Sequence, residues 1–176
     1  MKFSATIRRT FLAISLVAAA LTIGCSSSDE NAKLPVFNMG ENIPIDRLIY
    51  VVTQATWHDR IGESLSAKLP QSRYLAVELQ VTNSGAEPKT IPPLRLLGAG
   101  DQVFTEETSV GGMRDWLGML RTVRPGAPVQ GKVIFDVPRA PYRLRIAESE
   151  FDPDGPGVLV EIPPAFGEPE SPLPVQ

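Results

Sequence analysis

The sequence has only one cysteine and one histidine among its 176 residues. A single cysteine excludes a disulfide within the chain. Thiolate and multi-histidine metal sites are excluded as well, because they need several such residues. The sequence also lacks a serine nucleophile motif, a phosphate-binding glycine loop and long helical periodicity. These absences favour a non-catalytic protein, and we predict no catalytic residues, no metal and no cofactor.

A basic cluster in the main part of the chain is also missing. The chain has 17 basic and 20 acidic residues, for a formal charge of −3. Three of the basic residues, Lys2, Arg8 and Arg9, and no acidic residue lie within residues 1–24, so the remainder carries −6. An acidic surface disfavours nucleic acid and anionic lipid as the main partner.

The N-terminal residues follow the pattern of a secretory signal. The basic residues Lys2, Arg8 and Arg9 precede an uncharged, mostly apolar run, Phe11–Ile23. This run is shorter than the roughly 20 residues that span a bilayer as a helix. We therefore predict a cleaved signal peptide over residues 1–24. The adjacent arginines fit both the general secretory route and the twin-arginine route, and the choice between them stays open.

The segment Leu21–Cys25 resembles a bacterial lipobox, with Gly24 as the small residue before the cut. The resemblance implies that Cys25 becomes the first residue and carries acyl chains such as palmitate. A lone thiol in an oxidising compartment has no partner in its own chain, which agrees with acylation. The alternative is an ordinary signal with an incidental cysteine. We expect a lipid-anchored envelope protein. In a Gram-negative cell, Ser26 would favour the outer membrane, facing the periplasm or the surface.

The remaining residues form one domain between two tails. Proline is frequent near the C-terminus, where it disfavours helices and central strands. The predicted organisation is a signal peptide (1–24), a lipidated tether (25–35), a β-sandwich domain (36–162) and a proline-rich flexible tail (163–176).

The central part of the sequence indicates short β-strands separated by turns. Residues 73–83 give the clearest pattern, because an apolar set alternates with a second set that is predicted to lie on a largely solvated face: Tyr74, Ala76, Glu78 and Gln80. The predicted core residues are Leu75, Val77, Leu79, Val81, Val133 and Phe135. Strands are predicted at 48–57, 73–83, 94–97, 102–105, 129–137, 142–147 and 158–162. Short strands at this spacing predict an all-β fold, namely an immunoglobulin-like antiparallel β-sandwich without a disulfide.

Three segments resemble one bacterial family. The first, Met39–Val52, contains a glycine–glutamate pair. The second, Tyr74–Gly85, is a valine-rich strand followed by Asn and Gly. The third, Arg124–Pro138, is a Pro-Gly turn followed by a strand with the pattern Phe-x-Val-Pro. The pattern is similar to a large family of domains of unknown function, sometimes mislabelled telomeric repeat-binding factor 2. The resemblance covers residues 36–162. It implies an immunoglobulin-like fold and brings no catalytic residues.

One glycine-flanked segment, residues 111–120, is apolar and not strand-like; only Met113–Leu120 has a pattern that fits a helical turn or two. Met113, Arg114, Trp116 and Met119 are of types enriched at protein interfaces, so these four residues form the predicted binding site. The alternative is a crossover that folds over one end of the sandwich and buries Trp116 and Leu117. Both interpretations stay open.

Two further patterns point to chemistry only weakly. His58–Asp59 offers an acid–base pair, but neighbouring strand residues face opposite ways, so a surface strand end is the simpler interpretation. Asp152–Gly155 resembles the start of a calcium loop, although no glutamate closes it, and an Asp-Gly turn is expected instead. We predict a non-catalytic envelope protein that binds or supports another envelope component. The alternative is a surface enzyme or enzyme inhibitor.

Overall fold

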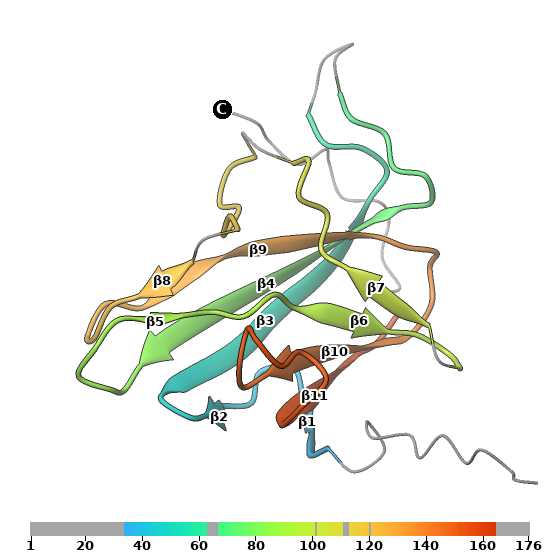
Figure 1. Cartoon of the computed structure of the whole chain (residues 1–176). Helices are drawn as coiled ribbons and strands as arrows, with labels where there is room; N and C mark the ends of the chain where they lie inside the picture. The colour runs from blue at the N-terminus through green and yellow to red at the C-terminus, as the bar shows by residue number, and fades with distance from the viewer. Residues whose placement is uncertain (1–33, 63–66, 101, 111–112, 120, 165–176) are drawn as a thin grey trace, which may run out of the picture.

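The computed structural model describes residues 34–62, 67–100, 102–110, 113–119 and 121–164, and every regular element in them is a β-strand (Figure 1). The five-stranded sheet has the order β1 (Val36–Asn38), β11 (Gly157–Ile162), β10 (Tyr142–Ala147), β6 (Arg95–Leu97), β7 (Val103–Thr105). The four-stranded sheet has the order β2 (Ile43–Ile45), β3 (Leu48–His58), β4 (Tyr74–Asn83), β9 (Val129–Asp136). A small third sheet pairs β5 (Lys89–Thr90) with β8 (Thr122–Val123).

The two larger sheets pack face to face and enclose one apolar core. Neighbouring strands are antiparallel, except that β1 runs parallel to β11. The predicted core residues are all 0% exposed: Leu75, Val77, Leu79, Val81, Val133 and Phe135. They face Leu96, Leu144, Ile146 and Val160 of the other sheet. The predicted all-β sandwich without a disulfide is therefore confirmed.

A β-bulge in β3 explains how this long strand keeps apolar residues in the core. Up to Val52 the even-numbered residues point inward. The register then shifts between Val52 and Gln54, so that Ala55 and Trp57 point inward instead. A bulge inserts one extra residue and so exchanges the two faces of the strand. The sequence pattern predicted the strand but not this exchange.

The outer face of the four-stranded sheet carries a second apolar cluster. Tyr74 and Ala76, which alternation placed on a largely solvated face, are only 3% and 2% exposed. They pack with Ile134 of β9 and with Val110 and Met113 from the connection between β7 and β8. The prediction of a wet face was wrong here, because a segment distant in sequence covers it.

The crossover from β9 to β10 carries a tyrosine at its end. The Tyr142 hydroxyl donates a hydrogen bond to the Pro138 carbonyl oxygen (2.6 Å), four residues upstream. The ring lies between Trp57 (6.4 Å between centroids) and Phe104 (5.7 Å). This contact fixes the point at which the chain passes from one sheet to the other.

Several predictions concern residues beyond the described ranges. The signal peptide, Cys25 and most of the tether and tail lie there, so their assignment remains a prediction. No helix in the described part of the chain is long and apolar enough to cross a bilayer. Each of the seven predicted strands corresponds to an observed strand. The short strands β1, β2, β5 and β8 were not predicted.

Candidate binding surface

The connection between β10 and β11, residues 148–156, is a well-bonded loop that folds back over the outer face of the five-stranded sheet (Figure 1). Its base is closed by a hydrogen bond from the Glu148 amide to the Pro156 carbonyl (2.9 Å). Arg145, in β10, is only 3% exposed and donates to two loop carbonyls. Its Nε bonds Pro153 (2.9 Å) and its Nη2 bonds Gly155 (2.6 Å).

A second arginine holds the far side of the same loop. Arg95, which lies opposite Arg145 on β6, forms an ion pair with Asp154 (2.7 Å). A Cβ on Gly155, in the predicted Asp-Gly turn, would overlap the Asp152 carboxyl group, which would have to move. Together these contacts fix the loop backbone at several points. A loop fixed in this way loses little conformational entropy on binding.

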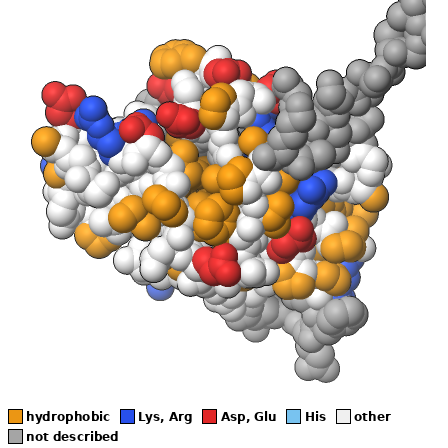
Figure 2. Space-filling model, turned by 90° about the horizontal axis from the view of Figure 1, so that it is seen from below, with side chains coloured by type: hydrophobic (Ala, Val, Ile, Leu, Met, Phe, Trp, Pro, Cys, Tyr) orange, Lys and Arg blue, Asp and Glu red, His pale blue; other side chains and the backbone are white. Residues whose placement is uncertain are grey.

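Phe151 lies at the tip of this fixed loop and is 89% exposed, the highest value among the exposed large apolar residues of the described chain. Its amide donates to Ser149 Oγ (3.2 Å), which directs the backbone and leaves the ring in solvent. Seen from below, the molecule shows hydrophobic side chains gathered among separate acidic and basic ones (Figure 2). Contiguous exposed apolar surface rimmed by polar residues is typical of interaction sites.

The loop forms one wall of an open groove of about 490 Å³. The other wall comes from the segment around β5. The lining residues are Pro88, Lys89, Thr90, Pro92, Glu148, Ser149, Glu150, Phe151, Asp152 and Pro156. A volume of this size falls within the range of ligand sites in proteins.

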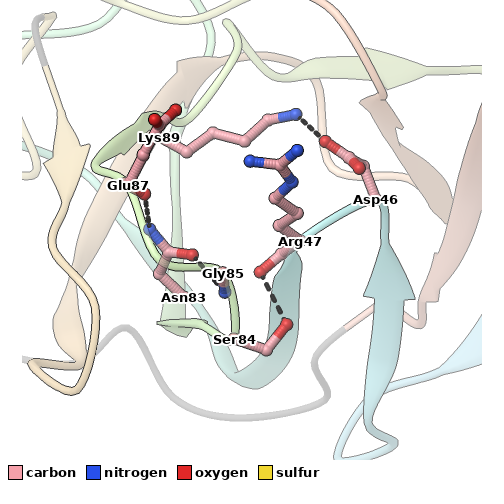
Figure 3. Close-up of polar contacts among 7 residues, drawn as sticks. All are labelled: Asp46, Arg47, Asn83, Ser84, Gly85, Glu87 and Lys89. Carbon is pink, nitrogen blue, oxygen red and sulfur yellow. Dashed lines mark hydrogen bonds and ion pairs between the residues drawn. The ribbon is translucent and has the colours of Figure 1, made fainter.

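The β5 wall is held by the hairpin turn that joins β2 to β3 (Figure 3). Lys89 forms an ion pair with Asp46 of that turn. The Lys89 hydrogen bond lowers the pKa of the Asp46 carboxyl below its ordinary value. Asn83 at the end of β4 donates to the carbonyls of Glu87 (2.7 Å) and Val123 (2.9 Å) and accepts from the Gly85 amide (2.8 Å). The positive charge of Lys89 is therefore already compensated.

The four residues predicted as a binding site are only partly accessible. Met113 is 6% exposed and belongs to the second apolar cluster, and Trp116 is half-buried against it. Arg114 is exposed, and Met119 is 66% exposed. The segment forms a turn instead of the helical turn that the sequence allowed. The structure therefore does not bring the four side chains together on one open surface.

This segment is bonded to the edge of β9. The Leu117 amide donates to the Lys132 carbonyl (3.0 Å), and the Lys132 amide donates to the Asp115 carbonyl (2.6 Å). Gly131 permits the approach, because a Cβ there would lie 2.6 Å from the Asp115 carbonyl oxygen. The segment thus covers a strand edge, as a crossover lid would.

A family model described as a domain of unknown function, DUF4352, matches residues 37–154. The chain belongs to this family. The resemblance to a family of domains of unknown function, stated from the sequence, is confirmed over residues 37–154. A search of curated protein sequences gives no match.

Three solved structures share the fold of this DUF4352 domain. The yjhA protein of Bacillus subtilis is 17% identical, with a TM-score of 0.52, over 72% of this chain and 98% of that one. A Bacillus subtilis protein described as a "putative lipoprotein" (ycdA) is 17% identical, with a TM-score of 0.51. That match covers 70% of this chain but only 38% of ycdA. A functionally unknown protein from Listeria monocytogenes is 13% identical, with a TM-score of 0.51, over 71% and 82%.

Several buried polar residues of this DUF4352 domain make contacts within the fold. His58 is 2% exposed, so the predicted surface position was wrong, and its Nε2 lies 2.9 Å from Thr56 Oγ1. The described residues hold no group of three or more His, Cys, Asp or Glu side chains placed for a metal. Glu106 forms a buried ion pair with Arg121 (2.5 Å) and accepts from the Leu94 amide.

Sequence reasoning missed Phe151. It lies in Ser149–Gly155, a run of turn-forming and acidic residues that was interpreted only as a turn between the last two strands. One signal was present: a large aromatic residue between two acidic residues in a predicted turn has no strand or helix face on which to be buried. Its position beside Pro88–Pro92 depends on contacts between segments about 60 residues apart, which no local pattern reveals.

Proposed function

We propose that this chain is a lipid-anchored protein of the cell envelope whose β-sandwich binds another envelope component without catalysing a reaction. The lipid anchor is Cys25, supported by the boundary of the apolar run, Gly24 and the polar residues that follow. The description of ycdA as a lipoprotein agrees with this location. In a Gram-negative cell the proposal places the protein in the outer membrane.

The exposed Phe151 on a fixed loop is the observation that carries the binding role. Burying such a ring in a partner gains apolar contact, while a loop already held by Arg145 and Arg95 loses little entropy. The same observation favours the second candidate, an inhibitor of a surface enzyme, because inhibitors often present a rigid side chain on a loop. Either way, the partner contacts the β10–β11 loop.

The position of the loop also fits an anchored protein. The Leu159 amide donates to the Pro35 carbonyl (2.9 Å), so the described chain begins beside β11, close to the end of the loop. A chain from Cys25 to Leu34 spans at most about 35 Å even when fully extended. An anchor at Cys25 would therefore keep the loop close to the membrane surface.

We also propose that the sandwich is immunoglobulin-like. The order of the five-stranded sheet, the parallel pairing of β1 with β11 and the return of β9 beside β4 support this assignment. The Tyr142 hydrogen bond to Pro138 supports it too, because a tyrosine corner at the start of a strand is a hallmark of such sandwiches.

The test uses photo-crosslinking in intact cells. A photoreactive phenylalanine analogue replaces Phe151 in one strain and Leu69, which is 74% exposed, in a control strain. We expect a discrete adduct from position 151 and none from position 69. Combining the position 151 probe with Cys25→Ala should move the protein out of the membrane fraction and reduce the adduct. Equal yields at both positions would contradict the binding role, and unchanged membrane retention and mature mass would contradict the anchor.

A further inference from the structure

We propose that the groove beside the β10–β11 loop binds a basic peptide segment of a partner protein, with an Arg or Lys side chain against the Phe151 ring. This inference rests on the binding role proposed above and specifies the chemistry of the partner. It is carried by the charges on the two walls, by the exposed ring and by the fixed backbone of the loop.

The charge on the groove is negative. Glu148, Glu150 and Asp152 lie on the loop wall, and none of them takes part in an ion pair within the described chain. The cation on the other wall, Lys89, is paired with Asp46 outside the groove lining. A basic side chain entering the groove would therefore gain from three uncompensated carboxylates. An acidic segment would be repelled.

The apolar surface of the groove suits the same kind of side chain. Phe151 offers a ring face, and cations are attracted to aromatic faces. The long stems of Arg and Lys also pack on apolar surface while their charged ends stay near water and carboxylates. Pro88, Pro92 and Pro156 supply further apolar surface and present no amide hydrogen that would compete for the carboxylates.

A peptide segment fits the shape better than a small cation does. The groove is open and about 490 Å³ in volume, so it has room for more than one side chain. A single ion would instead need a compact set of ligands, and the described residues form no such set. Because the groove is exposed to solvent, binding should weaken as salt screens the carboxylates.

The experiment uses the chain from residue 25 to 176 with Cys25→Ser, which removes the acylated thiol. The probe is a fluorescein-labelled nonapeptide of alternating alanine and arginine, and the control peptide carries glutamate in place of arginine. Fluorescence polarisation is measured at low salt and at about 150 mM NaCl. We expect the arginine peptide to bind, more weakly at higher salt, and the glutamate peptide not to bind.

Two substitutions separate a specific groove from general attraction to an acidic protein. Phe151→Ala leaves the charge unchanged and should weaken binding about fivefold. Glu150→Gln should weaken binding by a similar factor, whereas Glu161→Gln, which removes an exposed carboxylate outside the groove, should leave it unchanged. Insensitivity to Phe151→Ala, or equal effects of the two glutamine variants, would overturn the proposal.

Other occupants give distinct results. Sedimentation with vesicles of phosphatidylglycerol and phosphatidylethanolamine that depends on Phe151, without peptide binding, would show a membrane contact and overturn the proposal. A dimer in analytical ultracentrifugation that Phe151→Ala abolishes would do the same. If the arginine peptide does not bind but the cellular adduct from position 151 persists, only the proposed basic character of the partner segment is wrong. If no adduct forms from position 151 either, the proposed binding role itself is wrong.

Discussion

Arg145 connects the sandwich to its exposed loop. The residue lies in the middle of β10, between the core residues Leu144 and Ile146, and its side chain points to the outer face. There it is nearly fully buried and bonds two carbonyls of the loop. Removing the guanidinium leaves those carbonyls without a charged donor and frees the loop backbone.

Arg145→Met should therefore loosen the loop while the sandwich stays folded. We expect a loss of about 2 kcal/mol in the free energy of unfolding, because hydrogen bonds from a charged donor are lost. The amides of Phe151 and Gly155 should exchange faster with solvent in a hydrogen-exchange experiment. Arg143→Met, on the same strand and face, serves as the control and should leave both amides unchanged. Unchanged amide exchange in the Arg145→Met variant would contradict the role of Arg145 in holding the loop backbone.

Phe135 and Phe151 should show that stability and binding depend on different residues. Phe135 is 0% exposed in the core between the sheets, whereas Phe151 is almost fully exposed. Phe135→Ala should lower the free energy of unfolding by about 3–5 kcal/mol, because it leaves a cavity. Phe151→Ala should change it by less than about 0.5 kcal/mol. Urea unfolding of both variants measures this contrast, and similar losses would mean that one of the two positions is wrongly placed.

At the scale of elements, the 113–117 segment acts as a cover for the β4 and β9 strands. Trp116→Ala should remove part of the second apolar cluster and lower stability by about 2 kcal/mol, less than a fully buried tryptophan would. The melting temperature should fall, and the adduct from position 151 should persist. If Trp116→Ala abolished the crosslinked adduct and left the melting temperature unchanged, the result would instead support this segment as the interface.

The sequence predicted strands best where the pattern is local. β4 and β10 alternate cleanly, and the inner residues Leu75 and Leu144 are buried as expected. Three features could not be predicted, because each depends on contacts distant in sequence. Tyr74 is buried by Val110 and Met113, β5 exists only by pairing with β8, and the bulge in β3 is a feature of its pairing with β4.

The candidate site was less predictable than the fold. Residue type favoured Trp116, because tryptophan is enriched at interfaces. Gly131, however, lets that segment approach β9 closely, so the ring is partly covered. The loop that carries Phe151 is held by Arg145, from the strand just before it, and by Arg95, from β6, and only the fold shows that these two arginines bond the loop.

At the scale of the whole molecule, the three tyrosines of the chain should report on folding at alkaline pH. Burial raises the pKa of Tyr50, Tyr74 and Tyr142 above the ordinary value of 10.0, and at Tyr74 the carboxylates of Glu107 and Asp136 contribute as well. The unfolded chain would release these protons from about pH 10, whereas the folded chain retains them. Stability should therefore be unaffected by the tyrosines below pH 10 and should fall as the pH rises above it.

Ultraviolet absorbance of tyrosinate, followed together with circular dichroism during an alkaline titration, tests this expectation. The two signals should change in one step above pH 10, because ionisation accompanies unfolding. Tyrosinate absorbance that rises near pH 10 while the β-sheet signal is unchanged would show that the rings are accessible in the folded chain.

We propose that the domain meets its partner through the β10–β11 loop and not through the 113–119 segment. The most direct measurement compares photo-crosslinking from positions 151 and 116 in intact cells that produce equal amounts of the full chain. We expect a discrete adduct from position 151 and only background from position 116. An adduct from position 116 with none from position 151 would contradict it.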